Sequence, residues 1–301
     1  MIQIIKKTNI DFVGKRYIFF ALSAALLLSG LVSLIVKKGP RWGLDFTGGN
    51  LVEVKFETAP SVDDVRKALT AAGLVSFEIQ SVSGHGVIVR AQLSREGEAK
   101  EDMGLKIQTA LEQSFADKKP VIMRKEFVGP TVGRHLFKQT GLAFLLTFVG
   151  IIVYVGFRFH APLWGAAGVV ALVHDVFATI GIFSIMDKEI TVTVVAALLT
   201  IAGYSINDTI VIFDFMREKM RLLRTEPLEK VINLSINDTL SRTLITNLTV
   251  FLVVLTLFFF GGEMIHDFAF AMVFGAIVGT YSTIGIAAAI IFEYTRIKSK
   301  K

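Results

Sequence analysis

A run of twenty residues without a charge, residues 17–36, restricts what this chain can fold into more than any other feature. As a helix it would be about 30 Å long, which matches the hydrocarbon core of a bilayer. Comparable apolar runs follow at 140–157, 161–186, 190–213, 243–260 and 268–292. A mean hydropathy of +0.59 is also too high for an ordinary soluble protein. The sequence therefore predicts a polytopic α-helical membrane protein with six transmembrane helices.

Basic residues gather on one side of these spans and indicate the orientation of the chain. They are Lys6, Lys7, Lys15 and Arg16 before the first span, Arg217, Lys219, Arg221, Arg224, Lys230 and Arg242 between the fourth and fifth, and Arg296, Lys298, Lys300 and Lys301 in the tail. Basic residues in short loops face the cytoplasm. We therefore expect residues 1–16, the connection 214–241 and the tail 294–301 to be cytoplasmic, and residues 37–138 to lie outside.

The same charges bear on processing and on partners. Lys6, Lys7, Lys15 and Arg16 precede the span 17–36 as they would precede a signal peptide, but the span is too long and no small-residue cleavage pattern follows it. We interpret it as a retained anchor. The net charge of +6 is largely this topology signal, so no nucleic-acid partner is predicted. The connection 216–237 is partly amphipathic and could contact membrane lipids.

Residues 37–138 predict a small α+β domain outside the membrane. Alternating apolar residues and turn signals predict strands at 51–56, 77–82, 86–92 and 121–127, with helices at 62–72 and 103–115. The order βαββαβ is the ferredoxin-like arrangement. No catalytic cluster stands in this domain. The chain has no cysteine, which excludes disulfides and cysteine-based metal sites, and we predict neither a metal nor a cofactor.

The fourth span carries polar residues where a membrane helix should be apolar. Tyr204, Asn207 and Asp208 lie within it, and a carboxylate in hydrocarbon costs about 2.5–3.5 kcal/mol on insertion scales. Counted from helix midpoints, Asp208 and Arg242 lie about 9 and 12 Å to the cytoplasmic side. The sequence therefore predicts that Asp208 and Arg242 pair, either as a proton-responsive site or as a static link between two helices.

Two further features lie inside the membrane. His174 and Asp175, in the third span, form a second ionisable pair that a static link would not need. We include both in a predicted proton relay with Asp208, Arg242, Tyr204 and Asn207. In the sixth span Gly275 and Gly279 form a GxxxG pattern, which permits close packing against another helix.

Glycine-rich segments mark both ends of the extracytoplasmic domain. The first contains Gly43, Asp45, Gly48 and Gly49, and the second contains Gly129 and Pro130. A phosphate-binding loop would require a following GK[ST] and a strand–loop–helix context, and neither is present. Conformational freedom at a junction between membrane and domain is the simpler interpretation.

Together these residues make the chain similar to a known family. The segments 43–49, 128–130 and 203–209, with His174–Asp175, Phe213–Asp214, 241–243, 260–262 and 279–282, resemble the SecD/SecF family of the bacterial Sec protein-export machinery, and its SecF-type members in particular. The resemblance covers nearly the whole chain and places it in the RND superfamily. One departure is Phe215, where the family commonly has an arginine.

The resemblance implies a function and partners. Such subunits pair with SecD in a twelve-helix bundle beside the SecYEG channel and use the proton-motive force to draw a translocating polypeptide outward. It also implies YajC and YidC as partners, the bacterial cytoplasmic (inner) membrane as the location, and a proton path through Asp208 and Arg242. We accordingly predict a multi-pass subunit that is not an enzyme.

Two other functions agree less well with the sequence. A proton-driven RND-type exporter of small molecules or lipids is the alternative, but such exporters generally carry much larger outer domains. An intramembrane enzyme using Asp208 and Asp214 is disfavoured, because six residues of helix place them about 240° apart.

Overall fold

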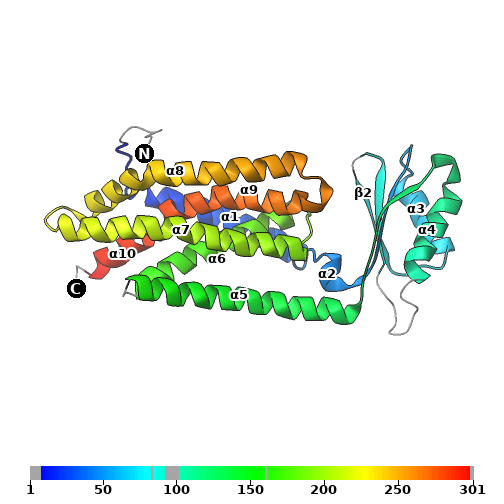
Figure 1. Ribbon diagram of the computed structural model, residues 1–301, viewed down its shortest axis with the longest axis horizontal. Coiled ribbons are helices and arrows are strands. Elements are labelled where there is room, and N and C mark those ends of the chain that lie inside the picture. The colour runs from blue at the N-terminus through cyan, green and yellow to red at the C-terminus, as the bar shows by residue number, and fades with distance from the viewer. Residues whose placement is uncertain (1–7, 83, 92–101, 160–161, 299–301) are drawn as a thin grey trace. The chain divides into compact units, whose positions relative to one another are not determined.

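The computed structural model describes residues 8–82, 84–91, 102–159 and 162–298. It separates into two compact units, which are described one at a time. The small domain comprises Trp42–Gly141, and the membrane unit comprises Met1–Arg41 with Leu142–Lys301. Figure 1 labels the elements along the chain.

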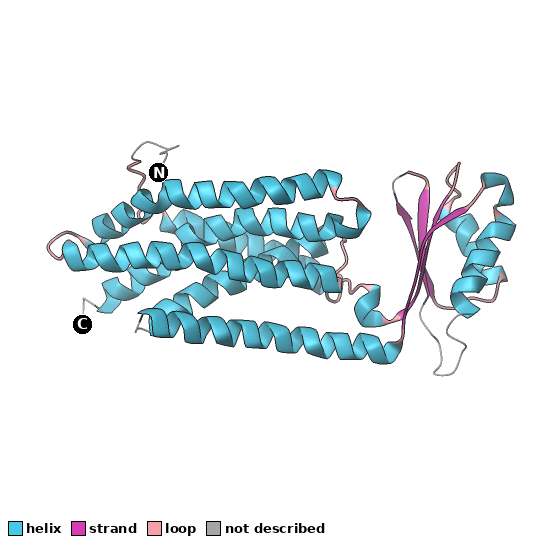
Figure 2. Cartoon of the chain, viewed as in Figure 1, coloured by secondary structure: helices cyan, strands magenta, loops and turns pink. Residues whose placement is uncertain are grey.

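The small domain is a four-stranded antiparallel sheet with two helices on one face (Figure 2). The sheet order is β2-β3-β1-β4, which confirms the predicted ferredoxin-like arrangement. Its elements are β1 (Gly49–Lys55), α3 (Val62–Ala71), β2 (Phe77–Val82), β3 (Gly86–Ala91), α4 (Asp102–Ser114), a 3₁₀ turn (Ala116–Lys118) and β4 (Val121–Val128). Gln92, the predicted end of the third strand, lies outside the described residues.

The core of this domain forms where the helices cover the sheet. Val52 and Val54 of β1 pack with Leu69 of α3 and Leu111 of α4, and all four side chains are buried. Helix α3 begins where Ser61 Oγ accepts a hydrogen bond from the Asp64 amide at 3.1 Å, which satisfies an otherwise unpaired donor of the first turn.

The two glycine segments pack against each other at the entrance to this domain. A helical turn that was not predicted, α2 (Leu44–Thr47), ends at Gly48, which has φ +69°. A β-carbon on Gly48 would lie 3.2 Å from Pro130 Cα, and one on Gly133 would lie 2.8 Å from the Phe46 carbonyl oxygen. The glycines therefore allow the backbones to approach closely, and Gly48 also allows a left-handed backbone conformation.

The membrane unit contains six helices long and apolar enough to span a bilayer, which confirms the predicted number. They are α1 (Arg16–Val36), α5 (Pro130–Phe159), α6 (Pro162–Ile185), α7 (Val192–Leu222), α8 (Leu228–Phe260) and a sixth span made of α9 (Glu263–Ser282), a π-helical turn (Thr283–Ala287) and α10 (Ala288–Lys298). Helix α5 begins in the small domain and continues into the membrane unit.

Helices α7 and α8 extend well beyond the apolar runs that predicted them. The connection expected at 214–241 consists mostly of their ends, so it forms no separate amphipathic helix. The extensions are held together because Met216 and Ile232 are buried between them and Lys219 pairs with Asp238 at 2.5 Å. Burial along both helices thus outweighs the membrane-surface placement that the amphipathic pattern indicated.

Close contacts at glycine residues fix the positions of neighbouring helices in this unit. A β-carbon on Gly30 of α1 would lie 2.7 Å from Gly181 Cα of α6, so the two backbones touch there. Gly275 of α9 instead leaves room for a side chain, since a β-carbon there would lie 2.3 Å from Ile201 Cδ1 of α7. Such contacts are typical of membrane helix packing, where van der Waals fit replaces the hydrophobic effect.

Candidate functional site

Asp208 lies on α7 where that helix faces α8, and its side chain is buried. Asn247 of α8 donates a hydrogen bond from Nδ2 to Asp208 Oδ2 at 2.6 Å. One turn away, the Tyr204 hydroxyl donates to the Thr246 carbonyl oxygen at 3.1 Å. The carboxyl group is therefore buried between two helices and held by a neutral amide.

Arg242 does not form the ion pair with Asp208 that the sequence predicted. Its side chain is exposed, and no ion pair joins the two among the residues that the structure describes. The reason is rotation around α8. Arg242 precedes Asn247 by five residues, which places it about 140° around the helix and more than one turn away. It shares its face with the exposed Thr249 and Thr256, at intervals of seven residues.

Asn247 is a site residue that the sequence reasoning missed. It is the only amide side chain inside the otherwise apolar and hydroxyl-bearing stretch 243–260, and that isolation was the available signal. A buried amide in a membrane helix needs a partner, as a buried carboxylate does.

Asp175 of α6 lies at the centre of a second polar cluster and has no exposed surface. Ser205 of α7 and Ser282 of α9 donate from their hydroxyls to Asp175 Oδ2 at 2.7 and 2.8 Å. His174 Nδ1 lies 3.0 Å from Asp175 Oδ1. Three helices thus meet at one carboxyl group, and each supplies a hydrogen-bonding side chain.

The histidine of this cluster is not fully satisfied. His174 is buried, and its Nε2 has no hydrogen-bond partner within the described residues. Its ring lies beside that of Tyr281, with 6.2 Å between centroids. A buried ring nitrogen without a hydrogen-bond partner is unusual in a folded protein, and it marks this cluster for attention.

The two carboxyl clusters share helix α7. Ser205, which donates to Asp175, stands three residues before Asp208, so both lie within one turn. The Thr209 hydroxyl lies 3.0 Å from that of Thr283, the first residue of the π-helical turn. Such turns interrupt the regular hydrogen-bond ladder and are frequent at functional sites.

The other predicted residues are placed differently. Asn207 is exposed, about 100° around α7 from Asp208, and within the described residues it joins neither cluster. Gly279 lies against the Asp175 cluster, since a β-carbon there would be 3.2 Å from Ser205 Oγ and 3.6 Å from Asp175 Oδ2. A larger residue at Gly279 would displace the serine from the carboxyl group.

An ionic cluster stands outside the spans, where α6 connects to α7. Lys37 and Arg41 lie 3.1 Å from the two carboxylate oxygens of Asp187, and Arg41 lies 3.2 Å from Glu189. The hydrogen bond from Lys37 and the charge of Arg41 hold the pKa of Asp187 below its usual value. This cluster links the end of α1 to the connection between α6 and α7. Over the described residues, no three His, Cys, Asp or Glu side chains gather as a metal site.

Comparison with known proteins gives consistent matches over the chain. Residues 106–297 match the family described as protein export membrane protein SecD/SecF, C-terminal, and residues 33–60 match the SecD/SecF GG motif. The chain is 45% identical to the protein translocase subunit SecF of Endomicrobium trichonymphae, over 98% of the chain and 94% of that protein. It is 40% identical to the SecF of Thermodesulfovibrio yellowstonii, over 97% and 96%.

Solved structures agree. The crystal structure of SecDF from Thermus thermophilus, described as a translocon-associated membrane protein, superposes with a TM-score of 0.82 at 34% identity. A super-membrane-facing form of SecDF superposes with a TM-score of 0.71 at 33% identity. The chain itself is covered to 96% and 98%, but it spans only 39% and 40% of those longer chains.

Proposed function

Because the chain belongs to the SecD/SecF family and to its SecF group of protein translocase subunits, we propose that it acts with SecD to promote late-stage polypeptide export across the bacterial cytoplasmic membrane. The driving force in this proposal is the proton-motive force. The subunit forms no covalent bond with its substrate and is not an enzyme. The observation that carries the proposal is Asp208, a carboxyl group buried in a membrane-spanning helix with a neutral partner.

Protonation of Asp208 would change its contact with Asn247. When ionised, the carboxylate accepts the Asn247 amide hydrogen across this 2.6 Å contact, and hydrogen bonds to an ionised acceptor are the stronger kind. The protonated carboxyl group is a weaker acceptor and gains a donor of its own. The contact between α7 and α8 is therefore different in the two protonation states, as a two-state element requires.

A proton gradient supplies enough free energy to bias such an element. One proton crossing about 100 mV releases about 2.3 kcal/mol, and each pH unit of gradient adds about 1.4 kcal/mol. Together these shift an equilibrium by two to three decades, provided the proton must bind Asp208 on its way. The Asp175 cluster includes Ser205, which lies one turn from Asp208 on α7. This cluster would serve as a second proton-holding position.

Arg242 is assigned a role in the assembled complex. An arginine exposed to hydrocarbon is costly, so such residues almost always face a bundle interior or a water-filled cavity. On the exposed face of α8, Arg242 would be covered by the partner subunit, and rotation of α8 would bring it closer to Asp208.

Helix α7 presents a seam that suits the SecD partner. Thr193, Ala196, Thr200, Gly203 and Asn207 are all exposed, all small or polar, and spaced by three and four residues along one face. Small residues in membrane helices allow close helix contact. We call this face the α7 seam and place the SecD half of the bundle against it.

Gly203→Leu should disrupt assembly with SecD. A β-carbon at Gly203 meets nothing within 4 Å in this chain, so the substitution leaves the fold intact, but it would keep a partner helix away. We expect at least a tenfold loss of SecD recovered by co-purification. Gly150→Leu is the matched control, because Gly150 of α5 is also exposed and also has open space around it. Equal recovery of SecD by both variants would remove the seam from the interface.

The termini and the α7–α8 connection should be cytoplasmic, and the small domain should be outside. Since the chain has no cysteine, single cysteines report position directly. Val75→Cys, at a site 92% exposed in the small domain, should react with a membrane-impermeant maleimide added to intact cells. Thr225→Cys, between α7 and α8, should react only after the membrane is opened. Labelling in the reverse pattern would contradict this orientation.

Reconstitution tests the function itself. Vesicles that contain SecYEG, SecD and the SecA ATPase should complete translocation of a stalled polypeptide faster under a proton gradient when this chain is present. Without the chain, the gradient should give no such stimulation. YajC and YidC are further proposed partners, and their addition should not replace the chain. Stimulation of equal size without the chain would refute the proposal.

A further inference from the structure

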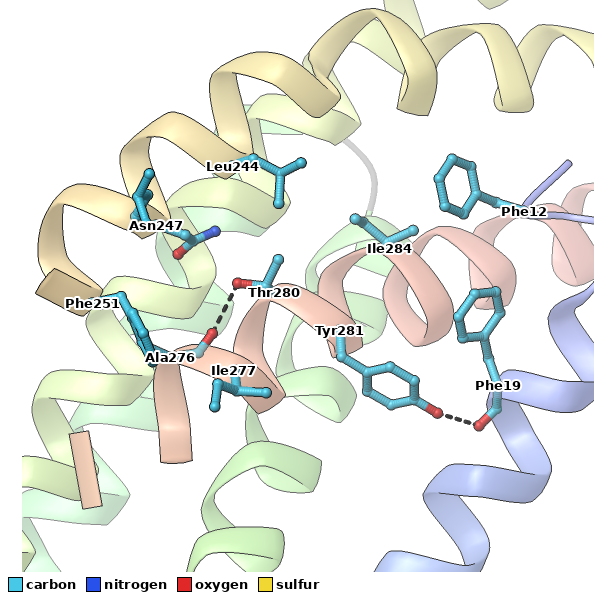
Figure 3. A pocket seen from close by; sticks show the side chains of 11 residues that line it. Phe12, Phe19, Leu244, Asn247, Phe251, Ala276, Ile277, Thr280, Tyr281 and Ile284 are labelled. Atoms are coloured by element: carbon cyan, nitrogen blue, oxygen red, sulfur yellow. Dashed lines mark hydrogen bonds between the residues drawn. The ribbon is translucent and has the colours of Figure 1, made fainter. Parts of the chain in front are cut away.

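A cavity of about 420 Å³ lies between the start of α1 and the middles of α8 and α9 (Figure 3). Its walls are almost entirely apolar, with Phe19 on α1, Phe251 on α8 and Ile277 on α9. This size falls in the range of cavities that hold small ligands.

Most of the polar groups in the cavity wall form hydrogen bonds within the protein. The Thr280 hydroxyl donates to the Ala276 carbonyl oxygen at 2.8 Å, and the Tyr281 hydroxyl bonds the Phe19 carbonyl oxygen. Asn247 Nδ2 is bonded to Asp208. The cavity therefore offers an occupant hydrocarbon contacts and no charged side chain, which suits an alkyl chain rather than a polar solute.

At one end of the cavity, hydrogen bonds join the segment before α1 to α8. Phe12 forms this end, and its backbone amide donates to Asn233 Oδ1 of α8 at 2.9 Å. The neighbouring Ile10 exchanges two bonds with Asn237, at 2.9 and 2.8 Å. These hydrogen bonds fix the segment before α1 to α8, and with it the end of the cavity that Phe12 forms.

The mouth of the cavity lies on the outer side of membrane helices. Leu248 and Ile277 line it and are 48% and 56% exposed. Both belong to helices long and apolar enough to span a bilayer, so the mouth opens sideways into hydrocarbon.

A positive charge stands near the end closed by Phe12. Lys15 is exposed and precedes Phe19 by four residues, so it lies one turn nearer the membrane surface at which α1 begins. The neighbouring Arg16 forms an ion pair with Glu293, with 2.6 Å between Arg16 Nε and Glu293 Oε1. Lys15 is therefore placed to attract an anionic group at the membrane surface while Phe19 contacts the chain below it.

We propose that this cavity binds one acyl chain of an anionic phospholipid, with the headgroup at Lys15. The bound chain packs against Asn247 on the side away from Asp208 and excludes water from their contact. The lipid site rests on the cavity and its charge alone, and it stands whether or not Asp208 carries protons.

Lipid retention tests the proposal directly. The full chain, purified in mild detergent from vesicles of phosphatidylglycerol and phosphatidylcholine, should retain one phospholipid per chain in native mass spectrometry, with phosphatidylglycerol preferred. Ile277→Trp at the mouth and Ala276→Phe in the wall should each reduce occupancy at least tenfold. Gly150→Trp, on an exposed face of α5, should leave it unchanged. Lys15→Gln should remove the headgroup preference and keep some binding.

Other results would overturn the site. Equal retention by Ile277→Trp, Ala276→Phe and Gly150→Trp would mean that lipid binds the outer surface without specificity. Retention by the chain alone but not by its complex with SecD would mean that a partner side chain fills the cavity. Since Ile277 is exposed, its variant should fold even if Ala276→Phe does not.

Discussion

Asp208→Asn should abolish the part of polypeptide translocation that depends on the proton gradient and leave the ATP-driven part unchanged. The asparagine keeps the size of the side chain and an oxygen that accepts from Asn247, but it cannot bind or release a proton. Folding and assembly with SecD should therefore persist. The measurement is translocation into inverted vesicles, with and without an imposed gradient, and we expect the stimulation by the gradient to fall to background.

The chain supplies a matched control for this substitution. Residues 235–239 repeat the sequence of residues 205–209, so Asp238→Asn makes the same change in the same pentapeptide. Asp238 is part-exposed and pairs with Lys219 near the α7–α8 connection, and such pairs contribute only about 0–1 kcal/mol. Its variant should keep full stimulation. If Asp208→Asn keeps it as well, the Asp208–Asn247 contact is a static link between helices and the proton-carrying role is wrong.

Much of the fold followed from patterns that the sequence states directly. Apolar runs of bilayer length predicted the six spans, and alternation with turn residues predicted the four strands of the small domain. The ends of α7 and α8 were harder, because their extensions are polar outside and buried only against each other. Met216 of α7 and Ile232 of α8 are buried in one cluster, and packing between two helices produces no pattern in the sequence of either helix alone.

The site was predictable in its carboxyl groups but not in their partners. Asp208 and Asp175 were found because a carboxyl group in an apolar run is costly wherever it points. The predicted partner of Asp208 was wrong because the position of a residue along a helix axis does not say which way its side chain points around that axis. Arg242 lies on another face of α8 and more than one turn from Asn247, which faces Asp208. Ser205 and Ser282 meet Asp175 only through the packing of three helices.

Two substitutions of Asp175 should distinguish its role in stability from its role in proton exchange. Asp175→Leu removes the carboxylate partner of His174 Nδ1 and of Ser205, while the Ser282 hydroxyl keeps the Gly279 carbonyl oxygen as an acceptor at 3.1 Å. Each buried donor left unsatisfied costs about 1–3 kcal/mol. The total is a large share of the 5–15 kcal/mol that stabilises a typical domain. We expect the thermal midpoint of the purified chain to fall on the order of 10 °C.

Asp175→Asn should behave differently. Its oxygen still accepts from the serine hydroxyls, and its amide can donate to His174 Nδ1 if the imidazole places its proton on Nε2. The thermal midpoint should stay within a few degrees of the unmodified chain, while the stimulation of translocation by the gradient should fall at least tenfold. Because Nε2 is unengaged, the tautomer needed is available without moving a helix. If Asp175→Asn keeps both stability and stimulation, Asp175 joins three helices and carries no proton, and Asp208 is left as the sole titrating carboxyl group of the relay.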